Sequence, residues 1–223
     1  MWVAPSRHAE IRNWTDAHWK SLPFSSEHDW DTAIEIFEDR VKYRYLDAIQ
    51  VLQNDDTEHY CTHEQRRFGF AMMALACLLI ETLAQFYEGL EDSDEARTRL
   101  SLNNTDFYVT FLTKKSFVLK SAFDEPKALA FYRTIRCGIL HQAETKEGST
   151  IRFFDDRNYS DRPLDLLADG ISLRIHWAEF HELVKGEFDA YCTHLKANDL
   201  PDLRGNFRRK MDFICRVEGG GVE

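Results

Sequence analysis

The chain has 223 residues, of which 43% are hydrophobic and 13% aromatic, a composition that supports a buried core and excludes an intrinsically disordered protein. Its formal net charge of −10 disfavours broad electrostatic binding to nucleic acids or anionic membranes. Five scattered cysteines without a C-x-x-C pair argue against a disulfide framework and for a reducing compartment.

The N-terminus and the longest apolar run both argue against export or membrane insertion. The first residues, MWVAPSRHAEIRNW, do not show the basic and then apolar pattern of a secretory signal. The apolar run over residues 68–80 ends at Glu81 and is too short to span a bilayer, so we interpret it as part of a buried helix. We therefore expect a cytoplasmic protein that does not contact a membrane.

The first half of the chain is predicted to be helical. Residues 6–20 can form a short helix. Over residues 29–53, apolar side chains recur at three- and four-residue steps, which is typical of a long amphipathic helix. A polar break then leads to the most apolar helix, at about 63–89, for which Gly89 is a candidate C-cap.

Further helices are predicted between residues 92 and 145. The segments NNTDFYVTFL and SFVLKSAF each favour a short helix, although the pattern over 92–123 is weak. Asp124 followed by Pro126 is a strong start signal, because an N-cap residue and a proline suit the first turn of a helix. The helix that begins there is predicted to reach about Thr145.

Past Gly148 the pattern changes to that of strands. The segments STIRFF and ISLRIH alternate and are rich in β-branched and aromatic residues, so we expect two strands of a small hairpin. Two more helices, at about 177–196 and 202–215, complete a mainly α fold, an antiparallel helical bundle with a small β-hairpin inserted before the last long helix. We expect one domain over residues 1–223, comprising an N-terminal extension (1–28), the hairpin insertion (148–176) and a C-terminal helix and tail (197–223).

The segment YRTIRCGILHQAETK, residues 132–146, combines an arginine, a glycine and a histidine within one predicted helix. Seven basic and only three acidic residues lie between 113 and 146, against the acidic balance of the whole chain. Arg136 and His141 are five residues apart, about 140° around an ideal helix axis, and do not share a face. Gly138 costs about 1 kcal/mol relative to alanine in a helix interior, so we expect a partner helix or backbone to approach it closely.

An arginine and a histidine in one segment suit phosphodiester chemistry. A guanidinium binds a phosphate through two parallel hydrogen bonds, and an imidazole can transfer a proton near neutral pH. RNA cleavage without a metal needs a base for the 2′-hydroxyl, an acid for the leaving 5′-oxygen and positive charge for the phosphorane. One Arg–His pair supplies half of these groups, and two copies across a twofold axis supply all of them.

The motif IRCGILHQ, late in a series of helices, resembles the R-x(4–6)-H motif of HEPN domains (higher eukaryotes and prokaryotes nucleotide-binding). The resemblance covers residues 30–196 in helix order and is specific only over 131–146. It implies a homodimer formed through the motif helix and a metal-independent endoribonuclease without a cofactor, commonly in a toxin–antitoxin or phage-defence system. By this resemblance Arg136 binds the scissile phosphate of RNA and His141 transfers the proton, and an inhibitory or regulatory protein is a further partner.

Spacing alone does not select this pair. Pairs that begin at Arg12 and at Arg174 also match the R-x(4–6)-H spacing. The first precedes every long apolar helix, and the second begins in a predicted strand, so only the pair of Arg136 and His141 has the right context. A non-catalytic helical module that binds a nucleotide or a protein through the same surface remains the alternative.

Three further residues are expected to support the site. Arg133 belongs to the same basic segment. Cys137 stands where active HEPN members often carry Asn, Asp or His, and it forms weaker hydrogen bonds; we favour a small buried residue over a nucleophile there. Glu81 interrupts the apolar helix and needs a partner, either as an ordinary salt bridge, which we slightly favour, or by orienting Arg136 or His141. The segment EHYCTHE lacks a second ligand pair, so no metal is expected.

Overall fold

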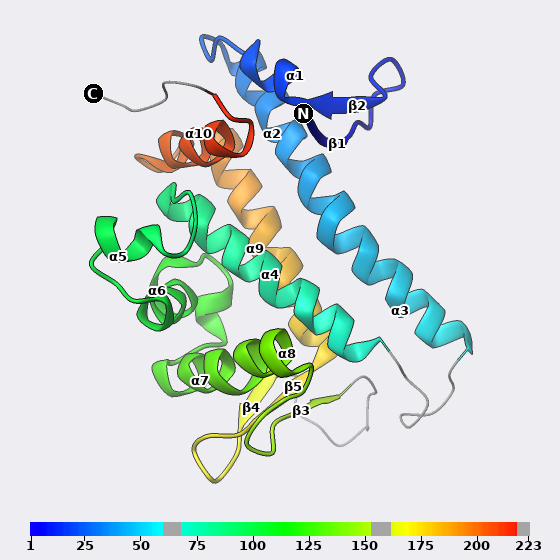
Figure 1. Cartoon of the computed structure of the whole chain (residues 1–223), viewed down its shortest axis with the longest axis vertical. Helices are drawn as coiled ribbons and strands as arrows, with labels where there is room; N and C mark the ends of the chain where they lie inside the picture. The colour runs from blue at the N-terminus through cyan, green and yellow to red at the C-terminus, as the bar shows by residue number, and fades with distance from the viewer. Residues whose placement is uncertain (60–67, 153–161, 218–223) are drawn as a thin grey trace.

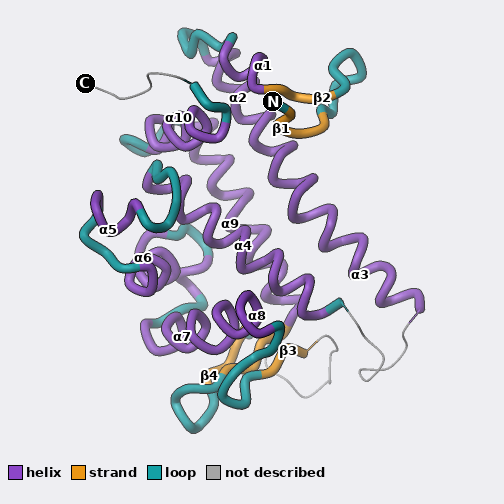
Figure 2. The backbone as a smooth tube through the Cα atoms, viewed as in Figure 1, coloured by secondary structure: helices purple, strands orange, loops and turns teal. Residues whose placement is uncertain are grey.

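The computed structural model describes residues 1–59, 68–152 and 162–217 of the chain (Figure 1). Over these residues the fold is a mainly helical bundle, which confirms the predicted fold class. The helices are α1 (Asp16–Lys20), α2 (Glu27–Val41), α3 (Asp47–His59), α4 (Gly69–Glu88), α5 (Glu95–Arg99), α6 (Asn104–Thr110), α7 (Glu125–Ala130), α8 (Cys137–Gln142), α9 (Trp177–Ala197) and α10 (Leu203–Ile214). Two small sheets lie near opposite ends of the bundle (Figure 2).

The predicted amphipathic helix is longer than its periodicity indicates. A π-helical segment, η1 (Lys42–Leu46), joins α2 to α3, so that one helical rod runs along an edge of the molecule (Figure 1). Ser26 caps it by accepting a hydrogen bond from the backbone N–H of Asp29 at 3.3 Å. Phe37 on its inner face is fully buried and packs against Phe86 and Phe207, with ring centroids 4.5 and 5.4 Å away. These rings tie the first helices to the last one.

The N-terminal helix predicted over residues 6–20 is wrong in its first part. Strands β1 (Trp2–Pro5) and β2 (Asn13–Thr15) pair antiparallel there, and only α1 is helical. The physical reason is that Trp14 is buried from an extended segment, where its indole N–H donates to Asp39 at 2.9 Å. The indole N–H of Trp19 in turn donates to Asp212 of α10 at 2.7 Å.

Helix α4 passes through the middle of the molecule and ends as predicted at Gly89, whose φ of 63° is the left-handed conformation that glycine favours at a C-cap. It is the one described helix that is long and apolar enough to cross a membrane. However, 56% of its most apolar stretch is buried inside the protein, as in the core helix of a soluble protein. Helix α10 packs against it.

A β-hairpin lies where predicted, before α9, but it is part of a mixed three-stranded sheet and its two strands are not the predicted pair. STIRFF and ISLRIH do contain neighbouring strands, β3 (Thr150–Arg152) and β5 (Leu173–His176), but these two run parallel. The hairpin partner of β5 is β4 (Leu164–Leu166), which pairs antiparallel on its other side. The β4–β5 turn contains Gly170 at a φ of 69°, and Asp169 there accepts the backbone N–H groups of Ile171 and Ser172, just before β5. This turn suits a short antiparallel connection, and it joins β5 to β4.

Candidate functional site

The motif helix consists of three consecutive segments. Helix α7 begins at the predicted cap, where Asp124 accepts the backbone N–H of Lys127 at 2.9 Å. A π-helical segment, η5 (Phe131–Arg136), follows, and α8 completes the helix as far as Gln142. Ile135 and Ile139 face the core and are buried, as their spacing predicts. The motif is therefore held along one side by the core.

Arg136 is held by an ion pair with α4. Its Nη2 lies 2.6 Å and its Nε 3.2 Å from Oε2 of Glu81, and the two side chains are only 16% and 17% exposed. Burial by itself would lower the pKa of Arg136, but the hydrogen bond and the charge of Glu81 outweigh it and raise that pKa above its ordinary value. Arg136 therefore carries its positive charge permanently. The contact is compatible with both interpretations of Glu81, because it is a salt bridge and it also orients Arg136.

The carboxylate of Glu81 is itself held by a hydrogen bond from Ser93, in the loop before α5. Its Oε1 accepts a hydrogen bond from the hydroxyl of Ser93 at 2.7 Å, and Gln85 donates to the same hydroxyl at 2.9 Å. A hydrogen-bonded chain that leads from Gln85 to Arg136 restricts the guanidinium to one direction. Such support is what a phosphate-binding arginine needs, because misplacement weakens a two-point contact.

Aromatic and sulfur groups surround the guanidinium. The Tyr132 ring centroid lies 5.5 Å from its Cζ, within the range of a cation–π contact. Cys137 is half-buried, and its Sγ lies 3.9 Å from Nη1 of Arg136. Burial raises the pKa of the Cys77 thiol, which keeps it neutral. The buried hydroxyl of Tyr108 has no hydrogen-bond partner among the residues that the structure describes.

His141 lies in the last turn of α8 and is exposed. Over the described ranges it makes no hydrogen bond, and none connects it to Arg136. One chain therefore presents a fixed guanidinium and, separately, an imidazole free to meet a ligand.

Gly138 is approached closely, but by the chain's own backbone. A Cβ on this glycine would lie 2.4 Å from the carbonyl oxygen of Glu144, far inside contact distance. The approach occurs because Ala143 ends α8 in the left-handed conformation and the chain turns back, so that the N–H of Lys146 donates to the carbonyl of Thr134 at 2.9 Å. The close approach expected at this glycine is therefore present, and it is made by the chain's own backbone and not by another helix.

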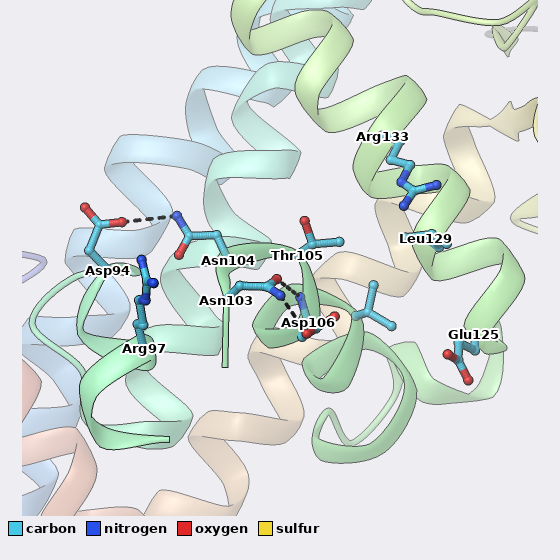
Figure 3. A pocket seen from close by; sticks show the side chains of 10 residues that line it. Asp94, Arg97, Asn103, Asn104, Thr105, Asp106, Glu125, Leu129 and Arg133 are labelled. Atoms are coloured by element: carbon cyan, nitrogen blue, oxygen red, sulfur yellow. Dashed lines mark hydrogen bonds between the residues drawn. The ribbon is translucent and has the colours of Figure 1, made fainter. Parts of the chain in front are cut away.

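Arg133 lies on the exposed side of the same helix and borders two pockets. One, of about 840 Å³, lies between α5, α6 and α7 (Figure 3), and the other, of about 370 Å³, reaches Ile171 in the β4–β5 turn. The larger pocket is also lined by Arg97, Asn104 and Thr105, which sequence reasoning missed. No spacing rule could have found them, because they belong to elements that only the tertiary fold brings beside Arg133.

Within the described residues no group of three or more His, Cys, Asp or Glu side chains is placed to hold a metal ion. Residues 60–64 of the segment EHYCTHE lie outside the described ranges. No protein-family model, curated protein or solved structure matches the chain.

Proposed function

We propose that the protein is a homodimeric, metal-independent endoribonuclease of the HEPN type, in which Arg136 binds the scissile phosphate and His141 transfers the proton. The observation that carries the proposal is that the two side chains differ in their contacts and exposure. Glu81 fixes Arg136 in direction and charge, whereas His141 remains exposed and free of hydrogen bonds over the described residues. A preoriented charge and an available proton carrier are the two components that metal-free phosphodiester cleavage needs.

The reaction requires two proton-transfer groups and a positive charge. One imidazole removes the proton of the 2′-hydroxyl, whose oxygen attacks phosphorus to form a 2′,3′-cyclic phosphate, while a second, protonated imidazole donates to the departing 5′-oxygen. The guanidinium stabilises the charge on the phosphorane oxygens. Because each chain contributes one motif histidine, His141, the second imidazole comes from a second copy related by a twofold axis.

An exposed apolar face on α4 supports dimerisation beside this site. Phe70 is 42% and Leu78 41% exposed, and with Ala74 between them they follow four-residue steps along one side of the helix. Glu81 comes three residues after Leu78, so this apolar face leads directly to the ion pair with Arg136. Large exposed apolar side chains in a row mark an interaction surface.

A second candidate function is a non-catalytic helical module that binds a nucleotide or a protein through the same surface. The observation that favours it is that Arg136 already has a carboxylate partner in Glu81, which a purely structural arginine also requires. The two functions differ in whether His141 is essential for a chemical step.

The test is an RNA cleavage assay in the presence of a metal chelator. We expect the wild-type protein to cleave RNA and leave cyclic phosphate ends, and His141→Ala to lose about 10²- to 10⁴-fold in rate, the usual contribution of a general acid or base. His28→Ala, an exposed histidine on α2, is the matched control and should cleave normally. Full cleavage by His141→Ala would contradict the proposal.

The dimer is tested separately, by light scattering and by Leu78→Asp. We expect a wild-type dimer, and a monomeric variant with a wild-type circular dichroism spectrum and little cleavage. A wild-type monomer that cleaves RNA would contradict the shared site. For the proposed toxin or defence role, expression in bacteria should arrest growth with the wild-type protein and not with His141→Ala.

A further inference from the structure

A large pocket lies beside the motif helix and has two arginines at its edges (Figure 3). Arg97 extends from α5 on one side, and Arg133 extends from η5 on the other. Its volume of about 840 Å³ is within the range of about 300–1,000 Å³ that is typical of small-ligand sites. It is open to solvent, so a chain-like ligand can enter it and leave it.

Two arginines and three carboxylates line the pocket. Neither guanidinium has an ion-pair or hydrogen-bond partner within the described ranges. Two of the carboxylates are occupied by neighbouring amides: Asp94 accepts from Asn104 at 3.1 Å, and Asp106 accepts from Asn103 at 2.7 Å (Figure 3). Glu125 of α7 has no hydrogen-bond or ion-pair partner within the described ranges. The pocket therefore offers two unpaired guanidinium groups to a negatively charged ligand and one unpaired carboxylate to its hydrogen-bond donors.

The remaining lining limits the ligand class. Carboxylates and amide oxygens repel a bare phosphate but accept hydrogen bonds from the amino groups of a nucleobase or from a ribose hydroxyl. Val109 and Leu129 add apolar surface for a base or a sugar. A ligand that fits must carry negative charge, hydrogen-bond donors and an apolar face together. A nucleotide has all three, and inorganic phosphate has only the first.

Arg133 and Tyr132 relate the pocket to the proposed site along the motif helix. Arg133 comes three residues before Arg136 in the same π-helical segment. Tyr132, the residue before Arg133, has its ring centroid 5.5 Å from Cζ of Arg136. We infer that this pocket binds one nucleotide of single-stranded RNA next to the phosphodiester held by Arg136, an inference that rests on the proposed function.

The experiment measures binding of a short fluorescent 2′-O-methyl oligoribonucleotide, which cannot undergo 2′-hydroxyl attack, by anisotropy at one fixed salt concentration. Arg97→Gln and Arg133→Gln should each weaken its affinity by about tenfold or more, as expected when a hydrogen bond to a charged group is lost. Arg12→Gln, an exposed arginine in the β1–β2 loop, is the matched control and should bind normally. Adenosine 5′-monophosphate should compete at concentrations at which inorganic phosphate does not.

Three outcomes would overturn the inference. Unchanged oligonucleotide binding in both pocket variants would exclude the pocket from the RNA path. Arginine-dependent binding of the mononucleotide alone would assign the pocket to a free nucleotide. Equal competition by inorganic phosphate would contradict the argument that the pocket lining favours a nucleotide over phosphate. The proposed function fails by a different result. Arginine-dependent oligonucleotide binding without any RNA cleavage would refute the nuclease activity, while the pocket would still be assigned to a nucleotide ligand. Circular dichroism melting of each variant excludes misfolding as the cause.

Discussion

Breaking the contact between Glu81 and Arg136 should lower the free energy of unfolding by an amount that depends on how deeply the ion pair is buried. The two side chains are 16% and 17% exposed, and their closest atoms are 2.6 Å apart. Exposed pairs contribute about 0–1 kcal/mol, and removal of one partner from a buried pair costs about 3–5 kcal/mol. The geometry lies between these limits. We expect Glu81→Gln and Arg136→Met each to lower the free energy of unfolding by about 2 kcal/mol.

The double variant separates the interaction itself from other effects of each change. If the pair interacts directly, the two losses are not additive, and the double-mutant cycle gives a coupling energy of about 1–2 kcal/mol. The assay is urea denaturation at pH 7, followed by circular dichroism. Lys185 and Glu182 on α9 form the matched control: their atoms are 3.0 Å apart, but the side chains are 40% and 67% exposed.

The same variants test whether Glu81 acts on function through the arginine. Glu81→Gln keeps the guanidinium but loosens it, so RNA cleavage should fall less than in Arg136→Met. A coupling energy below about 0.5 kcal/mol, no larger than that of an exposed helix pair, would refute the reasoning. It would mean that solvent screens the contact and that Glu81 does not hold Arg136 in place.

Three further outcomes follow from particular contacts. Gly138→Ala should destabilise by about 1–3 kcal/mol in urea denaturation, although alanine is normally the better helix former, because its Cβ meets a backbone carbonyl at 2.4 Å; a stabilised variant would contradict this. Glu187→Ala should cost about 4 kcal/mol or more in the same assay, because this fully buried carboxylate accepts three backbone N–H groups and the Tyr87 hydroxyl; a loss below about 1 kcal/mol would be inconsistent with those bonds. Burial lowers the pKa of His181, so the native state holds it neutral while the unfolded state binds a proton below about pH 6.5. Wild-type stability should therefore fall as the pH drops from about 6.5 to 5, and more steeply than that of His181→Phe; parallel curves would contradict the assignment.

The helices could be predicted because their signals are local. A cap at Asp124, a left-handed stop at Gly89 and apolar side chains at helical steps act within a few residues of the backbone that they shape. The strands show the limit of this reasoning. Alternation correctly placed β3 and β5, but it does not encode the direction in which two strands pair. Only the turn around Gly170 and the position of β4 in the fold decided that.

The candidate site divides in the same way. The sequence by itself determined a helix that carries Arg136 and His141 about 140° apart, and a glycine between them that requires a close neighbour. Only the tertiary structure decided that this neighbour is the chain's own backbone, that Glu81 is the partner of Arg136, and that Arg97 shares a pocket with the motif helix. The physical reason is that contacts between residues far apart in sequence depend on how whole helices pack, and that packing is a cooperative property of the entire core.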